Sequence, residues 1–234
     1  MQLRFVSDLR RAAQMYSLSL VREHVKGANS ESVIRSVLGV AVDASGNAVV
    51  ADNFNYRVRR VTSVGRVRTW LGDGSAASTP GVRLAASFND PRGVAVDGSG
   101  NAFFVERVGC IVSAATAAGS VSLLAGQPAV CGHTIGLAGA AQFNNPVGIT
   151  LFGADVFVGD GNSLRRVKTA DGDVTTAAGT MGSSGFVDGI LGTGLLGELW
   201  GVDADSSGNI ICVDQQREAI RKVDPSTGLI TTIA

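Results

Sequence analysis

The stretch Gly39-Val40-Ala41-Val42-Asp43-Ala44-Ser45-Gly46-Asn47 decides the fold, because the chain of 234 residues repeats it. It returns nearly unchanged as Gly93–Asn101, in a degenerate form as Gly148–Asp155, and again as Gly201–Asn209. The first glycines of the four copies, at positions 39, 93, 148 and 201, are separated by 54, 55 and 53 residues. A period this regular is typical of proteins built from repeated supersecondary units.

Each copy predicts four short strands. In the first copy, the valine-rich runs Gly39–Asp43 and Ala48–Asp52 flank a turn whose glycine and asparagine tolerate a positive φ. Two further runs follow at Arg57–Val61 and Arg66–Leu71, again separated by a turn. Four antiparallel strands per repeat are the unit of a β-propeller blade, so the sequence predicts an all-β fold made of four-stranded blades.

Several elements recur in the same order in the copies. They are a Gly-Val-Ala-Val-Asp strand, a Ser-Gly-Asn turn, an apolar strand ending in Ala-Asp, a strand such as Arg-Val-Arg-Arg-Val and a closing Thr-Thr-Ala-Ala-Gly. In this combination the chain resembles the NHL-repeat β-propellers over residues 39–234. The segments Ser87–Pro91 and Gln142–Pro146 match the run-in with which that family enters its next blade. The resemblance implies a propeller that acts mainly as a binding module.

The repeats divide the chain into two regions. Residues 1–36 do not match the repeat and are expected to be a leader or part of a blade, with 33–37 as a candidate strand. Residues 37–234 are expected to form the propeller, with blades at about 37–90, 91–145, 146–199 and 200–234. NHL propellers usually have six blades, so the chain is either a four-bladed propeller or part of an incomplete six-bladed ring.

Composition excludes some classes of function. With 20 basic and 20 acidic residues, the chain has no strong field to attract nucleic acid or an anionic membrane. No secretory signal is evident, and the uncharged stretch between Arg107 and Asp155 is too rich in Gly, Ser and Thr to predict a membrane span. We expect Cys110, Cys131 and Cys212 to be ordinary thiols, and a Cys110–Cys131 disulfide only in an exported chain. These features favour a cytoplasmic location.

The repeated acids are expected to be structural. Asp52, Asp160 and Asp214 end the second strands of their copies, and Arg59, Arg165 and Arg221 stand at equivalent places in the third strands. The second copy has Glu106 and Ser113 instead, so acid and arginine are replaced together. A paired Asp–Arg clamp explains this joint replacement better than independent ligands do.

No catalytic, metal or cofactor site is predicted. The acids beside the Gly/Asn turns are Asp43, Asp97 and Asp203 or Asp205, and they are expected to accept hydrogen bonds from turn amides. His24 and His133 are isolated, so neither a metal-ligand set nor a catalytic triad is formed.

A partner is expected to bind the loops that join second to third strands and the loops between blades, since variable loops above a rigid scaffold carry function. The candidate contacts there are Asn53, Phe54, Asn55, Tyr56, Arg107, Asn162, Gln215, Gln216 and Arg217. Arg92 and Trp200 precede innermost strands and are expected at the mouth of the central channel. For Trp200 the alternative is a buried side chain that fills the channel.

The expected function is non-catalytic binding of a protein partner. Two alternatives stay open. One is binding of single-stranded RNA by stacking on Tyr56 and Phe54, which the balanced charge does not favour. The other is an enzyme similar to calcium-dependent lactonases or amidating lyases, which the scarcity of histidine does not favour. The third and fourth strands of the second blade are also expected to form an uncharged outer edge that docks a neighbour or another part of a longer protein.

Overall fold

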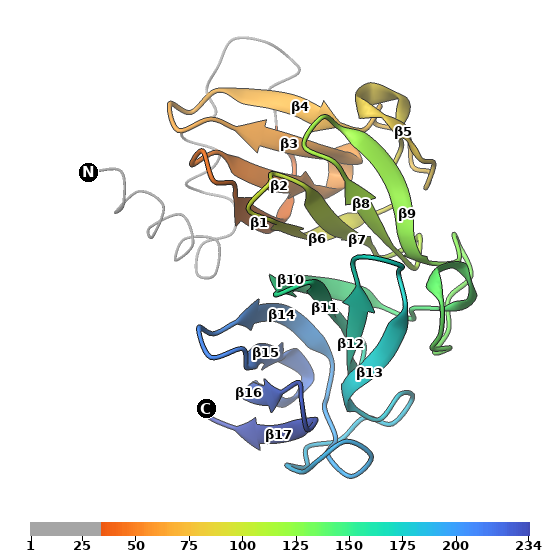
Figure 1. Cartoon of the computed structure of the whole chain (residues 1–234), viewed down its shortest axis with the longest axis vertical. Coiled ribbons are helices and arrows are strands. Elements are labelled where there is room, and N and C mark those ends of the chain that lie inside the picture. The colour runs from red at the N-terminus through yellow and green to blue at the C-terminus, as the bar shows by residue number, and fades with distance from the viewer. Residues whose placement is uncertain (1–33) are drawn as a thin grey trace. The chain divides into compact units, whose positions relative to one another are not determined.

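The computed structural model describes residues 34–234, which form short strands, turns and a few single-turn 3-10 helices (Figure 1). The strands fall into four antiparallel sheets, each with four strands that neighbour one another in chain order, and one sheet has a short fifth strand, β5, at its edge. The predicted all-β, β-propeller fold with four-stranded blades is therefore confirmed. Residues 1–33, with the expected leader or partial blade, lie outside the described residues. Within residues 34–234 the structure has no helix that could cross a membrane.

The blades have the following elements. Blade 1 contains β1 (Val37–Val42), β2 (Ala48–Asp52), β3 (Arg57–Val61) and β4 (Val67–Leu71). Blade 2 contains β6 (Pro91–Val96), β7 (Ala102–Glu106), β8 (Ile111–Ala115) and β9 (Ser120–Gly126), with the short β5 (Gly81–Val82) at its edge. Blade 3 contains β10 (Pro146–Phe152), β11 (Asp155–Asp160), β12 (Ser163–Lys168) and β13 (Val174–Gly179). Blade 4 contains β14 (Leu199–Ala204), β15 (Ile210–Asp214), β16 (Ala219–Asp224) and β17 (Leu229–Thr232). The 3-10 helices are η2 (Asn53–Asn55), η3 (Arg83–Ala85), η4 (Ala138–Ala140) and η5 (Gln215–Arg217).

The chain divides into two compact units. The first holds the described residues up to Phe104 together with Ala114–Ser122, and the second holds Val105–Ser113 and Leu123–Ala234. Blade 1 thus belongs to the first unit and blades 3 and 4 to the second, while the sheet of blade 2 is divided between them.

Each unit has its own apolar core. In the first unit, the rings of Phe88 and Phe104 meet edge to face with their centroids 4.9 Å apart, and Trp70 packs into the same cluster. In the second unit the core is aliphatic and includes Leu164, Leu196, Leu199, Ile210, Val223 and Ile230. These side chains come from strands and from the loops that enter the blades, so both kinds of segment are needed to exclude water from the core.

The opening glycine of the repeat allows neighbouring first strands to approach closely. A Cβ atom at Gly39 in β1 would lie 2.3 Å from the carbonyl oxygen of Arg92 in β6. At Gly148 in β10 it would lie 2.4 Å from the carbonyl oxygen of Trp200 in β14. Real Cβ atoms do not approach backbone oxygens so closely, so only glycine fits these two places.

In blades 1, 2 and 4 the turn that follows the opening glycine is held by an aspartate, as predicted. The Asp43 carboxylate accepts hydrogen bonds from the amides of Ser45 and Asn47, at 3.0 and 2.8 Å. Asp97 and Asp205 accept the equivalent bonds in their own turns. Of the two candidates in the fourth copy, Asp205 is the one that holds the turn.

The uncharged edge of blade 2 differs from the expectation. Val121 and Ser120 of β9 pair with Gly81 and Val82 of β5, so this part of the outer edge is already occupied by the chain itself. Ser113 lies in a central strand, where it is buried. The prediction that this edge docks a neighbour is therefore wrong for the stretch that β5 covers, because backbone groups already paired in a sheet cannot pair with another strand.

The role of the opening glycine can be tested with Gly148→Ala. The added methyl group must displace the backbone of β14, so we expect a loss of about 2–3 kcal/mol in the free energy of unfolding, measured by urea denaturation. The matched control is Gly98→Ala, because a Cβ atom at Gly98 would meet nothing within 4 Å. The control should change stability by less than about 0.5 kcal/mol, and equal losses in the two variants would contradict the close-approach explanation.

Candidate functional site

A buried ion pair joins the second and third strands of three blades. The Asp52 carboxylate lies 2.9 Å from Nε of Arg59, and the Asp160 carboxylate lies 3.1 Å from Nη1 of Arg165. The corresponding distance from Asp214 to Arg221 is 3.4 Å. All three acids are fully buried, so the predicted Asp–Arg clamp is confirmed in each of these blades.

The acid of each clamp also holds the segment through which the chain enters its blade. Asp52 accepts a hydrogen bond from the amide of Arg35 at 3.0 Å. Asp160 accepts the amides of Asn144 and Asn145, both at 2.8 Å, and Asp214 accepts the amide of Gly197 at 2.8 Å. One carboxylate therefore fastens the run-in segment, a central strand and the arginine of the next strand.

In blades 3 and 4 the arginine of the clamp holds the loop between blades. Nη2 of Arg165 donates to the carbonyl of Thr134 at 3.0 Å. Nη1 of Arg221 donates to the carbonyl of Leu195 at 3.3 Å, and its Nη2 donates to Asp188 at 2.8 Å. The planar guanidinium suits this use, because it offers several donors in a fixed geometry.

Blade 2 replaces the ion pair with a neutral donor. The Ser113 hydroxyl donates to the Glu106 carboxylate at 2.6 Å, at the place that the clamp occupies in the other blades. The longer glutamate compensates in part for the loss of the long arginine, so the joint replacement seen in the sequence has a geometric reason.

Burial determines the electrostatics of the clamp in blade 3. Loss of hydration raises the pKa of the Asp160 carboxyl, although the amides of Asn145 and Asn144 and the charge of Arg165 act in the opposite direction. Loss of hydration also lowers the pKa of the Arg165 guanidinium. Each charge is thus costly to bury alone, and the pair is retained because each member supplies the counter-charge of the other.

The turn after β2 presents an exposed aromatic ring on a braced frame. Phe54, at the tip of η2, is 65% exposed. Tyr56 closes the turn with a φ of 52° and donates its amide to the carbonyl of Asn53 at 3.0 Å. The side-chain amide of Asn55 donates to Asp52 at 2.7 Å, which joins the turn to the clamp.

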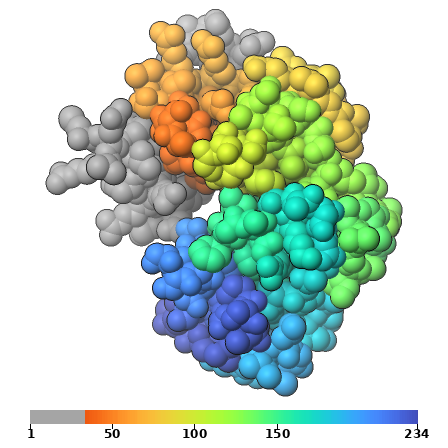
Figure 2. All heavy atoms as spheres, in the orientation of Figure 1, coloured from red at the N-terminus to blue at the C-terminus, as the bar shows by residue number. Residues whose placement is uncertain are grey.

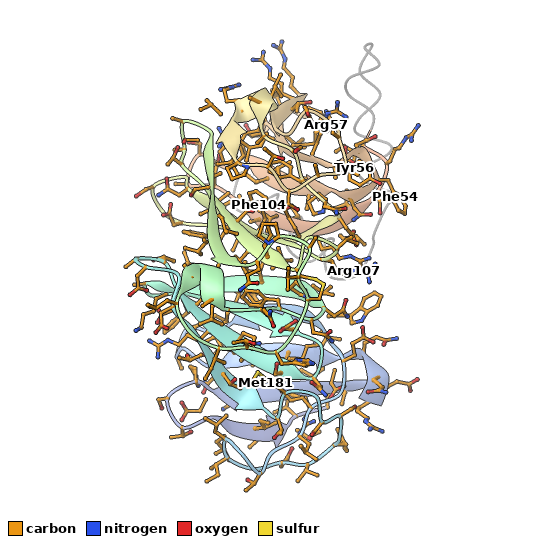
Figure 3. The ribbon with its side chains drawn as sticks, turned by 90° about the vertical axis from the view of Figure 1, so that its right-hand side faces the viewer. Phe54, Tyr56, Arg57, Phe104, Arg107 and Met181 are labelled. Carbon is orange, nitrogen blue, oxygen red and sulfur yellow. A yellow bond between two sulfur atoms is a disulfide. The ribbon has the colours of Figure 1, made fainter. Side chains whose placement is uncertain are left out.

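Arg57 braces the same turn from the other side. Its guanidinium donates to the carbonyl of Asn55 at 3.1 Å and to the carbonyl of Asp73 at 2.6 Å, which lies in the loop after β4. Figure 3 shows Phe54, Tyr56 and Arg57 together in blade 1. The ring of Phe54 is therefore held out by a turn that is fixed at both ends.

Two other candidates in the first unit are engaged within the protein. Asn53 is 3% exposed, and its side chain bonds to Asp90 and to the carbonyl of Pro91, so its assignment as a partner contact is wrong. Arg92 forms an ion pair with the same Asp90, at 3.2 Å, and its side chain is mostly buried. Asn53 and Arg92 thus share one acid that stands where the chain enters blade 2.

In the second unit, Arg107 belongs to a polar chain that sequence reasoning missed. Its guanidinium donates to the side chain of Asn145 at 3.5 Å, and the amide of Asn145 donates to Glu198 at 2.8 Å. Asn145 and Glu198 stand directly before β10 and β14, the same place that Asp90 has before β6. This shared position, one residue before each first strand, is the sequence signal from which the polar chain could have been predicted.

Trp200 is 43% exposed, so the alternative of a fully buried, channel-filling residue is wrong. Asn162 is half-buried and accepts a hydrogen bond from the amide of Gly182 at 3.2 Å. Gln215, Gln216 and Arg217 are exposed on η5.

The turns after the second strands of blades 1, 2 and 4 share one frame. Each closes with a residue of positive φ: 52° at Tyr56, 54° at Cys110 and 52° at Glu218. The tips differ, because Phe54 corresponds to Val108 in blade 2 and to Gln216 in blade 4. The frame is thus common to blades 1, 2 and 4, and the tip is its variable part.

In blade 2 the frame is closed by a disulfide between Cys110 and Cys131, so the expectation of free thiols is wrong for this pair. The bridge spans 21 residues and ties the turn to the following loop. Cys212 is a free, buried thiol, and burial, followed by the nearby Asp214 charge, raises its pKa to about 12.

The remaining titratable side chains are dispersed. Within residues 34–234, no three His, Cys, Asp or Glu side chains lie close enough together to hold a metal ion.

Comparisons with known proteins support the fold. No protein-family model matches the chain, and no curated protein matches it. Among solved structures, a protein of unknown function from Bacteroides thetaiotaomicron is 20% identical with a TM-score of 0.67, covering 80% of this chain and 46% of its own. An auxiliary nutrient binding protein from the same organism is 15% identical with a TM-score of 0.65, covering 85% and 48%.

A third similar structure is virginiamycin B lyase from Staphylococcus aureus, which is 14% identical with a TM-score of 0.57, covering 88% of this chain and 57% of its own. The chain thus spans about half the length of the solved proteins that it matches. At these identities the likeness shows a propeller fold and no particular activity.

The clamp can be tested with Asp160→Ala. Removing the acid leaves the buried Arg165 without its counter-charge, so we expect a loss of about 3–5 kcal/mol in the free energy of unfolding, measured by urea denaturation. The matched control is Asp155→Ala on the same strand, whose partner Arg166 is partly exposed. The control should cost less than about 1 kcal/mol, and a similarly small cost for Asp160→Ala would contradict the clamp.

The state of the cysteines can be tested by alkylation. At pH 8 the folded chain should not react with iodoacetamide, because Cys212 is buried and protonated and the other two cysteines are bonded. Unfolding without reductant should expose one reactive thiol, and unfolding with reductant should expose three, as counted by mass spectrometry. More than one adduct in the absence of reductant would contradict the disulfide.

Proposed function

We propose that this propeller is a non-catalytic binding module of the NHL-repeat type, which recognises a protein partner through the turn that follows the second strand of blade 1. The observation that carries the proposal is Phe54, a large apolar ring that is 65% exposed on a braced turn. Aromatic side chains are enriched in protein interfaces, where they supply much of the contact area. The family assignment is supported by the repeated strand, turn and run-in motifs.

The rigidity of the frame favours binding. Tyr56, Asn55 and Arg57 fix the turn through hydrogen bonds before any partner arrives. A contact residue that is already ordered loses little conformational entropy on binding, so more of its contact energy contributes to affinity. Phe54 is thus better suited to recognition than an equally exposed side chain on an unbraced loop.

The use of the repeat acids also supports binding over catalysis. Asp52, Asp160 and Asp214 are each bonded to an arginine and to a backbone amide. A general base or nucleophile must be able to reach a substrate, and these buried carboxylates have tasks in the scaffold. The lactonase-like and lyase-like alternatives would therefore need other groups.

The proposal can be tested with Phe54→Ala in the full chain. The immobilised protein is exposed to an extract of the source cells, and retained proteins are quantified by mass spectrometry. We expect a partner whose retention falls at least tenfold in the variant, because removing a central aromatic contact costs about 2 kcal/mol or more. Affinity for the purified partner is then measured directly and should fall by about 30-fold.

The matched control is Gln216→Ala, which changes the tip of the equivalent turn in blade 4. It should retain the same partner as the unchanged chain, and both variants should have the unfolding midpoint of the unchanged chain. Pretreatment of the extract with ribonuclease should have no effect, whereas loss of retention would indicate RNA. If no protein depends on Phe54, the proposed binding surface is incorrect.

A further inference from the structure

Three exposed arginines of the first unit stand at places where the other blades have no basic residue. Arg66 and Arg68 are the first and third residues after the turn glycine of blade 1, and Arg83 is the second residue after Gly81 of β5. The residues at the places of Arg66 and Arg68 in the other blades are Ser120 and Ser122, Asp173 and Thr175, and Leu229 and Thr231. The repeat therefore does not need these arginines for its fold.

Arg68 stands beside a fourth arginine that is stacked on a tryptophan. Arg60 on β3 is directly opposite Arg68 on β4, so the two side chains share one face of the sheet. The guanidinium carbon of Arg60 lies 4.1 Å from the ring centre of Trp70. Asp43 is 3.7 Å from Nε of Arg60, but its carboxylate also holds the turn after β1. Like charges directly opposite each other destabilise a sheet, so this pair favours the approach of an anion.

Arg83 is fixed beside the same tryptophan. It has a φ of 52°, donates its amide to the carbonyl of Gly119 at 2.8 Å and accepts the amide of Gly72 at 3.0 Å. A Cβ atom at Gly119 would lie 2.7 Å from Cγ of Arg83 and 3.6 Å from Nε1 of Trp70, so both side chains reach this turn. Figure 2 shows the segments of β4, in orange, and of Arg83, in yellow, adjoining at the surface.

The balanced charge of the chain conceals a difference between the two units. The described residues of the first unit contain eight arginines and no lysine against five acids. Those of the second unit contain seven basic and twelve acidic residues. The guanidinium groups of Arg66, Arg68 and Arg83 form no ion pair within the described residues, so the excess positive charge of the first unit is available at its surface.

We propose that Arg60, Arg66, Arg68 and Arg83, here called the arginine surface, dock an extended acidic segment of a partner protein. Alternate residues of a strand lie about 6.6 Å apart on one face, which is the spacing between Arg66 and Arg68. An extended peptide with an acid at every second residue presents its carboxylates at the same interval. Each guanidinium can then bind one carboxylate with two parallel hydrogen bonds.

The surroundings of the arginine surface favour a protein over a nucleic acid. Trp70 is only 3% exposed beneath Arg60, so it offers no ring on which a base could stack. Val82 and Leu84, on either side of Arg83, are 61% and 56% exposed. These apolar side chains can contact the uncharged residues of an acidic peptide, which adds contact area to the charge complementarity.

The proposal is tested by fluorescence anisotropy with a labelled peptide in which glutamate and threonine alternate. At low salt, where surface charges are least screened, the full chain should bind it. Replacing Arg66 and Arg68 together by serine, the residue that blade 2 has at both places, should weaken binding about tenfold. A peptide of the same composition with all glutamates contiguous should bind at least about threefold more weakly, because half of its carboxylates point away in an extended chain.

The matched control replaces Arg166 and Lys168 of blade 3 by serine, which removes the same charge from residues already paired with Asp155 and Asp173. It should change the affinity less than about twofold, and both double variants should keep the unfolding midpoint of the unchanged chain. Phe54→Ala should leave peptide binding intact, so this proposal and the proposed function can fail separately.

Four results would overturn the proposal. They are no binding of the alternating peptide to the unchanged chain, equal affinity for the two peptides, equal weakening in the two double variants, and tighter binding of an oligouridylate of the same charge. The last result would assign the arginine surface to nucleic acid.

Discussion

The buried carboxylate at the end of each second strand is the interaction on which the rest of the structure depends. In blades 1, 3 and 4 it accepts an amide of the incoming chain and pairs with the arginine of the third strand. Because that arginine also holds the loop between blades in blades 3 and 4, one acid positions three segments that are distant in sequence. A charge buried in this way is costly unless every partner is in place, so the clamp favours one arrangement of the loops over others.

Comparison of the copies predicted the fold and much of the scaffold. The regular spacing of the opening glycines predicted the blades. The joint replacement at Glu106 and Ser113 predicted that the acid of the second strand pairs with a residue of the third strand, which the structure confirms. Contacts between residues far apart in sequence could not be obtained in this way. The burial of Asn53, the disulfide of Cys110 and the polar chain from Arg107 to Glu198 all depend on how the loops are placed in space.

The candidate surface was predictable as a set of loops but not as a set of side chains. The sequence could only mark polar and aromatic residues of the variable turns as candidates, whereas the structure separates the buried Asn53 from the exposed Phe54 next to it. That separation follows from the direction of each side chain in a single-turn 3-10 helix, which spacing along the chain does not specify for so short an element. The proposed recognition surface is accordingly smaller than the predicted one.

In blades 2, 3 and 4 a glycine of the loop that precedes the blade pairs with the outer strand of that blade and so covers its edge. This covering has a consequence for the order in which the parts of the protein are synthesised. In blades 2, 3 and 4 the covering glycine precedes its outer strand by 38 to 41 residues, as the pairs Gly136–Val174 and Gly189–Ile230 show at the two extremes. A ribosome therefore releases each cover before the edge that needs it. Each outer strand can therefore be covered as soon as it is synthesised. Fewer unpaired strand edges are then open to pairing with a neighbouring nascent chain.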